Sequence, residues 1–244
     1  MKKVSEEWFE EYLTAHCYEY VYQPNLGGKK NPDFLIMREG IEAICEVKEF
    51  DTLGFVGLLA KQPGTLVSRP VKKLLDPVRN QISAAASQLK EYQTTKLPMI
   101  IVLANPNDAG VNLSLEFVIS AMYGDIATRF SMGANGETVS ENVFGRNGQL
   151  TNNHQYISAV VVVDKHEKNQ EAANAFIKTL YRENPHMRAE VAVQLLKKEE
   201  EKFGPEIVSY ECSVFETASK VCTPLPATIL NGPNDVRLKC QMGK

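Results

Sequence analysis

The chain has 244 residues, of which 43% are hydrophobic and 23% charged, and its formal net charge is −3. This composition is typical of a globular protein and excludes the disordered, collagen-like and disulfide-framework classes. No run approaches the ~18 uncharged apolar residues of a membrane span, and the first residues lack the apolar stretch of a signal peptide. We therefore expect a cytoplasmic protein without a membrane partner.

Cysteine, histidine and charge patterns narrow the chemistry further. The five cysteines form no Cys-x-x-Cys pair and the four histidines show no zinc-binding spacing, so we expect neither disulfides nor zinc. The net charge argues mildly against a nucleic-acid binder, but its distribution is uneven. Residues 60–98 carry seven basic side chains against two acidic ones, which predicts a basic patch there.

The first half of the chain predicts a helix followed by strands. Ser5 is the expected N-cap of the first helix, with two glutamates in its first turn. Aromatic and β-branched runs predict strands, and Arg38-Glu39-Gly40 predicts a hairpin turn. The expected elements are a helix over Ser5–Ala15, strands over Tyr18–Gln23, Pro32–Met37 and Ile41–Phe50, a helix over Asp76–Tyr92 and a strand over Leu97–Ala104.

The second half predicts more helices around further strands. The expected elements are a helix over Leu113–Phe130, a loop over Gly133–Asn153, a strand over Tyr156–Asp164, helices over Asn169–Arg182 and Ala189–Phe203, and a strand near Val208–Phe215. No repeat or linker divides the chain. We expect one domain over 1–244 with a core of about 5–164 and an elaboration of about 165–244. Its class is α/β, with a mixed central sheet flanked by helices.

The predicted hairpin brings two carboxylates together. If Glu39-Gly40 is a two-residue loop, Arg38 pairs with Ile41 and Asp33 falls directly opposite Glu46. Opposed residues have Cβ atoms roughly 4.5–5.5 Å apart on one sheet face, and Lys48 shares that face because strands have a period of two. A three-residue loop would shift the register by one, since Glu-Gly is a poor type I′ turn.

Two carboxylates and an ammonium group on a largely apolar sheet are costly unless they are paired or bind an ion. Asp33, Glu46 and the Val47 carbonyl could hold Mg²⁺ (or Mn²⁺), which keeps waters for a phosphate and a nucleophile. Lys48 would then orient the attacking water or stabilise charge on the phosphate. A structural salt bridge at a sheet edge is the alternative.

The order of elements and motifs resembles the PD-(D/E)XK nuclease superfamily, which has the restriction-endonuclease-like fold. The resemblance covers about residues 5–104, with Pro32-Asp33 as the PD motif and Glu46-Val47-Lys48 as the ExK motif. Its exonuclease branch carries a Gln-xxx-Tyr element on the next helix, which Gln88 and Tyr92 match. The resemblance implies a metal-dependent nuclease acting on DNA.

The same resemblance suggests further site residues. Many members add a glutamate from the first helix as a metal ligand, and among Glu6, Glu7, Glu10 and Glu11 we favour Glu10, which follows Phe9. Gln88 would contact a metal-bound water or a phosphate, and Tyr92 the nucleic acid; a surface polar residue beside a core tyrosine is the alternative.

Basic side chains near that helix are candidates for phosphate contacts, namely Lys72, Lys73 and Arg79. The basic Gly27-Gly28-Lys29-Lys30 segment before the PD strand is expected to be a flexible lip, since it lacks a P-loop motif. The leading hypothesis is a Mg²⁺-dependent deoxyribonuclease, and a homodimer stays open. A nuclease-fold binding or regulatory module without turnover is the alternative, as is unrelated chemistry around a structural acid network.

Overall fold

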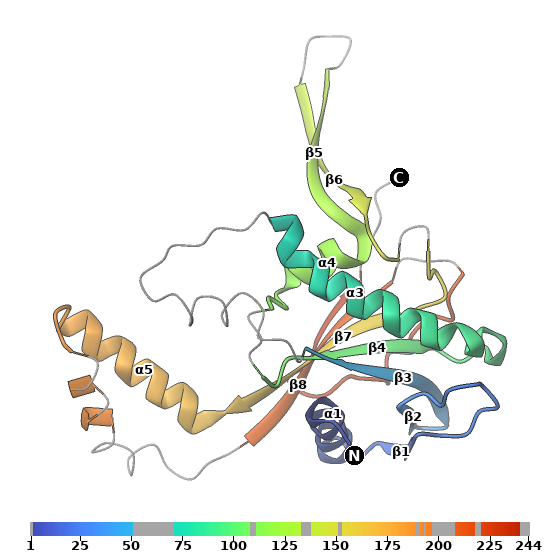
Figure 1. Cartoon of the computed structure of the whole chain (residues 1–244), viewed down its shortest axis with the longest axis horizontal. Helices are drawn as coiled ribbons and strands as arrows, with labels where there is room; N and C mark the ends of the chain where they lie inside the picture. Colours follow the sequence, from blue (N-terminus) through green and yellow to red (C-terminus); the bar gives the residue numbers. More distant parts are fainter. Residues whose placement is uncertain are drawn as a thin grey trace. The chain divides into compact units, whose positions relative to one another are not determined.

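The computed structural model describes residues 2–50, 71–107, 111–132, 138–150, 153–188, 191–192, 194–196, 208–217 and 221–239. Seven strands form one sheet, in the spatial order β1 (Glu19–Tyr22), β2 (Phe34–Arg38), β3 (Ile41–Glu49), β4 (Met99–Ala104), β7 (Ala159–Glu167), β8 (Val208–Glu216) and β9 (Val236–Lys239) (Figure 1). β1, β2 and β3 are antiparallel, whereas β4 is parallel to both β3 and β7. The expected α/β class with a mixed central sheet is confirmed.

The remaining described elements are helices and a hairpin. They are α1 (Val4–Ala15), α3 (Val71–Leu89), the 3₁₀ helix η1 (Lys90–Thr95), α4 (Leu115–Tyr123), β5 (Gly124–Met132), β6 (Thr138–Asn147) and α5 (Lys168–Glu183). β5 and β6 pair only with each other among the described strands. Within the described residues, no helix is both long and apolar enough to span a bilayer.

Helices cover both faces of β3. On one face, Ile44 packs in an apolar cluster with Val78 and Ile82 of α3. On the other face, the Phe9 ring of α1 meets the Phe34 ring edge-on at 5.4 Å between centroids. Because successive strand residues alternate between faces, even-numbered residues of β3 point toward α3 and odd-numbered ones toward α1.

The β2–β3 hairpin has the register that a two-residue loop requires. Phe34 pairs with Cys45 and Arg38 with Ile41. Glu39 and Gly40 both have positive φ, 54° and 76°, which is the conformation of a type I′ turn. The two-residue loop is therefore confirmed, and the alternative three-residue loop is excluded.

Three predicted helix boundaries were wrong. α3 begins at Val71, five residues before the expected start at Asp76, so Pro77 lies inside the helix and not in its first turn. α1 begins at Val4, so Ser5 is not its N-cap; the Ser5 amide donates instead to Glu49 Oε2 at 3.0 Å. The helix expected over Leu113–Phe130 ends at Tyr123, because Gly124 has a φ of 109° and leaves the helical conformation. The alternating residues that follow form β5, and its partner β6 lies where a loop was expected.

The chain divides into two compact units. One comprises Met1–Val163 with Cys212–Lys244, and the other Asp164–Glu211. The segment from Cys212 onward therefore groups with the core, although we expected it to belong to the elaboration. Its strand β9 had not been predicted. Of the helix expected over Ala189–Phe203, the structure describes residues 191–192 and 194–196, in helical conformation.

Candidate functional site

Three polar side chains meet where β3 faces α3. The Lys48 ammonium lies 2.8 Å from Glu46 Oε1 and also donates a hydrogen bond to Gln88 Oε1 of α3. Glu46 is 2% exposed and the Lys48 side chain 13%. Lys48 is thus a largely desolvated cation held by a carboxylate of its own strand and by an amide of the covering helix.

Asp33, the residue directly before β2, joins this cluster. Continuing the observed register by one residue places it opposite Glu46, and its Oδ2 accepts a hydrogen bond from the Val47 amide at 2.7 Å. Burial, and after it the nearby Glu46 charge, raise the pKa of the Asp33 carboxyl, and the Val47 amide and Lys48 act in the opposite direction; the net result is a pKa of about 6. The two carboxylates therefore repel one another across the hairpin.

This donor set suits a hard cation. Mg²⁺ commonly takes one or two protein carboxylates and completes its shell with water and substrate phosphate. Asp33 and Glu46 supply such a pair, and a cation between them would remove the repulsion that raises the pKa of Asp33. In the part of the chain that the structure describes, no three His, Cys, Asp or Glu side chains form a metal-binding group.

The glutamates of α1 are arranged differently from our expectation. Glu10, which we favoured, forms an ion pair with Lys2 and accepts a hydrogen bond from the Tyr20 hydroxyl at 3.1 Å. Glu6 is instead the buried one: it accepts a bond from the Tyr22 hydroxyl at 2.8 Å and is among the charges that raise the pKa of Asp33. The charge of α1 that Asp33 senses is therefore that of Glu6.

A sequence signal for Glu6 existed. Tyr20 and Tyr22 alternate on one face of β1, and Glu6 and Glu10 are four residues apart on one face of α1. If the tyrosine face of β1 packs against the glutamate face of α1, each tyrosine hydroxyl meets one glutamate, as observed for Tyr20 with Glu10 and Tyr22 with Glu6. Tyr22 pairs with Phe34, so its glutamate partner is the one at the Asp33 end.

The two residues of the Gln-xxx-Tyr element have different contacts. Gln88 bonds to Lys48, as described above. Tyr92 is only 2% exposed and its hydroxyl donates to the Lys30 carbonyl, so its side chain is engaged inside the protein and not presented to a nucleic acid. This corrects the expectation for Tyr92, whose burial in the apolar cluster beneath α3 follows from the 3₁₀ turn of η1.

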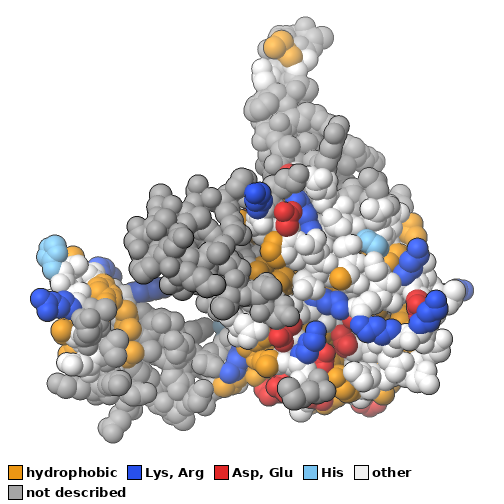
Figure 2. Space-filling view, in the orientation of Figure 1, with side chains coloured by type: hydrophobic (Ala, Val, Ile, Leu, Met, Phe, Trp, Pro, Cys, Tyr) orange, Lys and Arg blue, Asp and Glu red, His pale blue; other side chains and the backbone are white. Residues whose placement is uncertain are grey.

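The basic residues of α3 that we expected to contact phosphates differ in their exposure to solvent. Arg79 is 4% exposed and forms an ion pair with Asp125 Oδ1 at 2.6 Å, so it holds α3 to the start of β5 and is not placed to contact a phosphate. Lys73 is exposed. The side chain of Lys72, and the part of the predicted basic patch within residues 51–70, lie outside the described residues. Figure 2 shows Lys and Arg side chains gathered around Asp and Glu in the region of β3 and the C-terminal end of α3.

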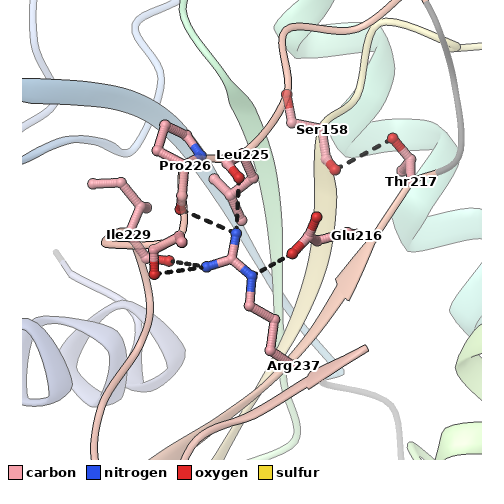
Figure 3. A network of polar contacts seen from close by, with 8 residues as sticks. Ser158, Glu216, Thr217, Leu225, Pro226, Ile229 and Arg237 are labelled. Atoms are coloured by element: carbon pink, nitrogen blue, oxygen red, sulfur yellow. Dashed lines mark hydrogen bonds and ion pairs between the residues drawn. The ribbon is translucent and has the colours of Figure 1, made fainter. Parts of the chain in front are cut away.

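A second polar network, on β8 and β9, is structural. Arg237 forms an ion pair with Glu216 and donates to the carbonyl oxygens of Leu225, Pro226, Ala227 and Ile229 (Figure 3). A guanidinium has five N–H donors, and these contacts use all five. Arg237 therefore fastens the segment before β9 to the sheet edge and has no donor left for a ligand.

The site thus brings two carboxylates, an ammonium group and an amide together on one face of the sheet, from Asp33, Glu46, Lys48 and Gln88. No protein-family model matches this chain, and neither a curated protein nor a solved structure does.

Proposed function

We propose that this protein is a Mg²⁺-dependent nuclease that hydrolyses phosphodiester bonds of DNA on a restriction-endonuclease-like fold. The observation that carries the proposal is the hairpin register, which sets Asp33 opposite Glu46 while Lys48 bonds to Glu46 and Gln88. Crowding these charges on a mostly buried sheet face destabilises the fold unless a ligand uses them. A structural salt bridge between Glu46 and Lys48 would not explain why a second carboxylate, that of Asp33, lies opposite Glu46.

The carboxylates of Asp33 and Glu46, together with the Val47 carbonyl, would hold Mg²⁺ or Mn²⁺. A cation held there would supply charge neutralisation at the phosphate and would lower the pKa of a bound water. Lys48 orients the attacking water and stabilises the negative charge that develops on the phosphate oxygens. Gln88 keeps the Lys48 side chain in place through its amide oxygen.

Glu6 contributes by its charge. It lies on the α1 side of the hairpin and raises the pKa of Asp33, so it increases the negative potential that draws a divalent cation to the pair. This role replaces the one that we had assigned to Glu10, whose carboxylate is taken by Lys2 and Tyr20.

The test is incubation of the full chain with supercoiled plasmid, linear duplex, single-stranded DNA and RNA, with Mg²⁺, Mn²⁺ or EDTA. Glu46→Gln and Lys48→Met are expected to lose cleavage by on the order of 10²-fold or more, because each removes a group that acts on the transition state. Glu42→Gln is the matched control, since Glu42 is an exposed glutamate on the same strand and should keep full activity.

Different outcomes separate the alternatives. Metal-dependent cleavage that survives in Glu46→Gln would move the active site elsewhere. Binding of DNA without cleavage under any metal would favour a nuclease-fold module that lacks turnover. Cleavage of RNA alone would show that the substrate is RNA and not DNA, and it would leave the proposed active site unchanged.

A further inference from the structure

The loop that precedes Asp33 is held in place by η1. We call residues 25–31, which connect β1 to β2, the lysine loop. The amide of Lys29 donates to Glu91 Oε2 at 2.7 Å, and the Lys30 carbonyl accepts a hydrogen bond from the Tyr92 hydroxyl. A Cβ at Gly28 would lie 2.7 Å from Tyr92 Cζ. Three successive residues are thus packed on or bonded to η1, so the lip that we expected to be flexible is anchored.

The two lysine side chains of this loop are directed to solvent. Lys29 and Lys30 are both exposed, as is Lys90 beside Glu91. In the described part of the chain, no carboxylate forms an ion pair with the ammonium group of Lys29 or Lys30. The backbone of the loop is therefore fixed while its positive charges stay available.

The lysine loop lies at the border of the carboxylate cluster. Lys30 is three residues before Asp33, and three residues span at most about 11 Å. The Glu46 charge also raises the pKa of Tyr92, after burial and the Glu91 charge, so the residue that holds Lys30 lies within electrostatic reach of the site. Gln88, which bonds to Lys48, is on the last turn of α3 directly before η1.

From this geometry we propose that Lys29 and Lys30 bind backbone phosphates of duplex DNA beside the phosphate that is cut, with Glu91 and Tyr92 as positioning residues. The inference rests on the proposed nuclease function and names how the substrate is held. The backbone of Lys30 lies within about 11 Å of Asp33, and phosphates follow each other every ~3.4 Å along the helix axis of one strand, so the phosphates within reach of the loop are neighbours of the scissile one. A pre-ordered loop binds more tightly because less conformational entropy is lost on binding.

The experiment measures binding of the full chain to a labelled duplex over a range of KCl concentrations, with Ca²⁺ in place of Mg²⁺. Lys29→Ala/Lys30→Ala is expected to weaken binding to all sequences alike and to reduce the slope of log K against log salt by about 1.8, since each duplex phosphate contact contributes about 0.9. The matched control Lys178→Ala/Lys239→Ala removes two exposed charges from α5 and β9 and should leave the slope unchanged.

Tyr92→Phe tests positioning separately from charge. It keeps both lysines and the buried ring but removes the hydroxyl that holds the Lys30 carbonyl. We expect a similar association rate, which long-range charge controls, and a several-fold faster dissociation rate. A circular-dichroism melt checks that each variant is folded.

The outcomes distinguish this inference from the proposed function. Wild-type cleavage together with an unchanged salt slope in Lys29→Ala/Lys30→Ala overturns the role of the loop alone. An equal loss of slope in the control variant also overturns it, because net charge would then be the cause. The expected slopes without any metal-dependent cleavage would support the loop and overturn the nuclease, and a wild-type protein that does not bind DNA would overturn both.

Discussion

Lys48 of β3 and Gln88 of α3 are joined by a hydrogen bond from the ammonium group to the amide oxygen. The second acceptor of that ammonium, Glu46 Oε1, is on the same strand. The position of the Lys48 charge therefore depends on how α3 packs on the sheet, and not on β3 alone. This dependence makes Gln88 a positioning residue whose removal should leave the charges of the site intact.

Gln88→Leu removes the acceptor for Lys48 with little change in volume. We expect kcat for DNA cleavage to fall about tenfold, which corresponds to about 1.4 kcal/mol, with KM unchanged, because Lys48 loses its orientation and not its charge. Gln88→Glu keeps an acceptor at the same position and should retain more activity. Equal kcat values for wild type and Gln88→Leu would contradict this role.

Asp33→Asn should stabilise the metal-free protein near neutral pH. The pKa of Asp33 is raised from 3.8 to about 6, so the native state binds this proton more tightly than the unfolded state. Stability therefore falls as pH rises from about 4 to about 6, and the loss is complete above that range. The amide keeps an oxygen for the Val47 N–H and carries no charge, so we expect a gain of about 1–3 kcal/mol at neutral pH.

Urea unfolding in EDTA across this pH range measures the effect of Asp33→Asn. The curve of stability against pH should be flatter for the variant than for wild type. A variant that is less stable than wild type at neutral pH, or that keeps the same slope, would show that folding does not raise the pKa of Asp33.

Lys48→Met should destabilise the metal-free protein, because it leaves the 2%-exposed Glu46 carboxylate without its cation. Breaking a buried ion pair in this way typically costs about 3–5 kcal/mol. The double variant Glu46→Gln/Lys48→Met should recover much of that loss, and the test is a double-mutant cycle of unfolding free energies. Additive losses would mean that the two groups do not stabilise each other.

Arg79→Met tests a structural role against a binding role. Because Arg79 is buried and pairs with Asp125 at 2.6 Å, we expect a loss of about 1–3 kcal/mol of stability and an unchanged salt slope of DNA binding. Lys72→Ala/Lys73→Ala should show the opposite pattern if those lysines contact phosphates, as the sequence predicts. If Arg79→Met has wild-type stability but a flatter salt dependence of DNA binding, Arg79 contacts a phosphate and its role is not structural.

Gly28→Ala should displace the lysine loop, since the added Cβ would lie 2.7 Å from Tyr92 Cζ. Overpacking of this kind costs roughly 1–3 kcal/mol. Gly27→Ala is the comparison: nothing lies within 4 Å of its Cβ position, and only its φ of 80° adds strain, about 1 kcal/mol. Thermal melts that rank Gly27→Ala as the more damaging change would contradict the packing of Gly28 on Tyr92.

The hairpin at the centre of the site could be predicted from the sequence because its determinants are local. A two-residue turn at Glu39-Gly40 sets which residues pair, and the strand period then determines that Glu46 and Lys48 share a face. The body of the helix that carries Gln88 was predictable for the same reason, since the helical period involves only neighbouring residues. The proline that we expected near its start did not mark the start, which is Val71. The seven-residue overestimate of the helix after Leu113, which ends at Tyr123 and not at Phe130, arose where an apolar helical pattern continued into a strand.

Only the tertiary structure decided which charged and polar side chains are free. Glu6 and Glu10 are equivalent by sequence pattern, and the packing of α1 on β1 gives one to Tyr22 near Asp33 and the other to Lys2. Arg79 and Tyr92 matched a binding pattern, yet both are buried and bonded to distant segments. Sequence by itself narrowed the hairpin to two alternative registers and favoured the correct one, because turn geometry and side-chain period act between neighbours. It did not determine these assignments, because desolvation and ion pairing depend on groups that only folding brings together.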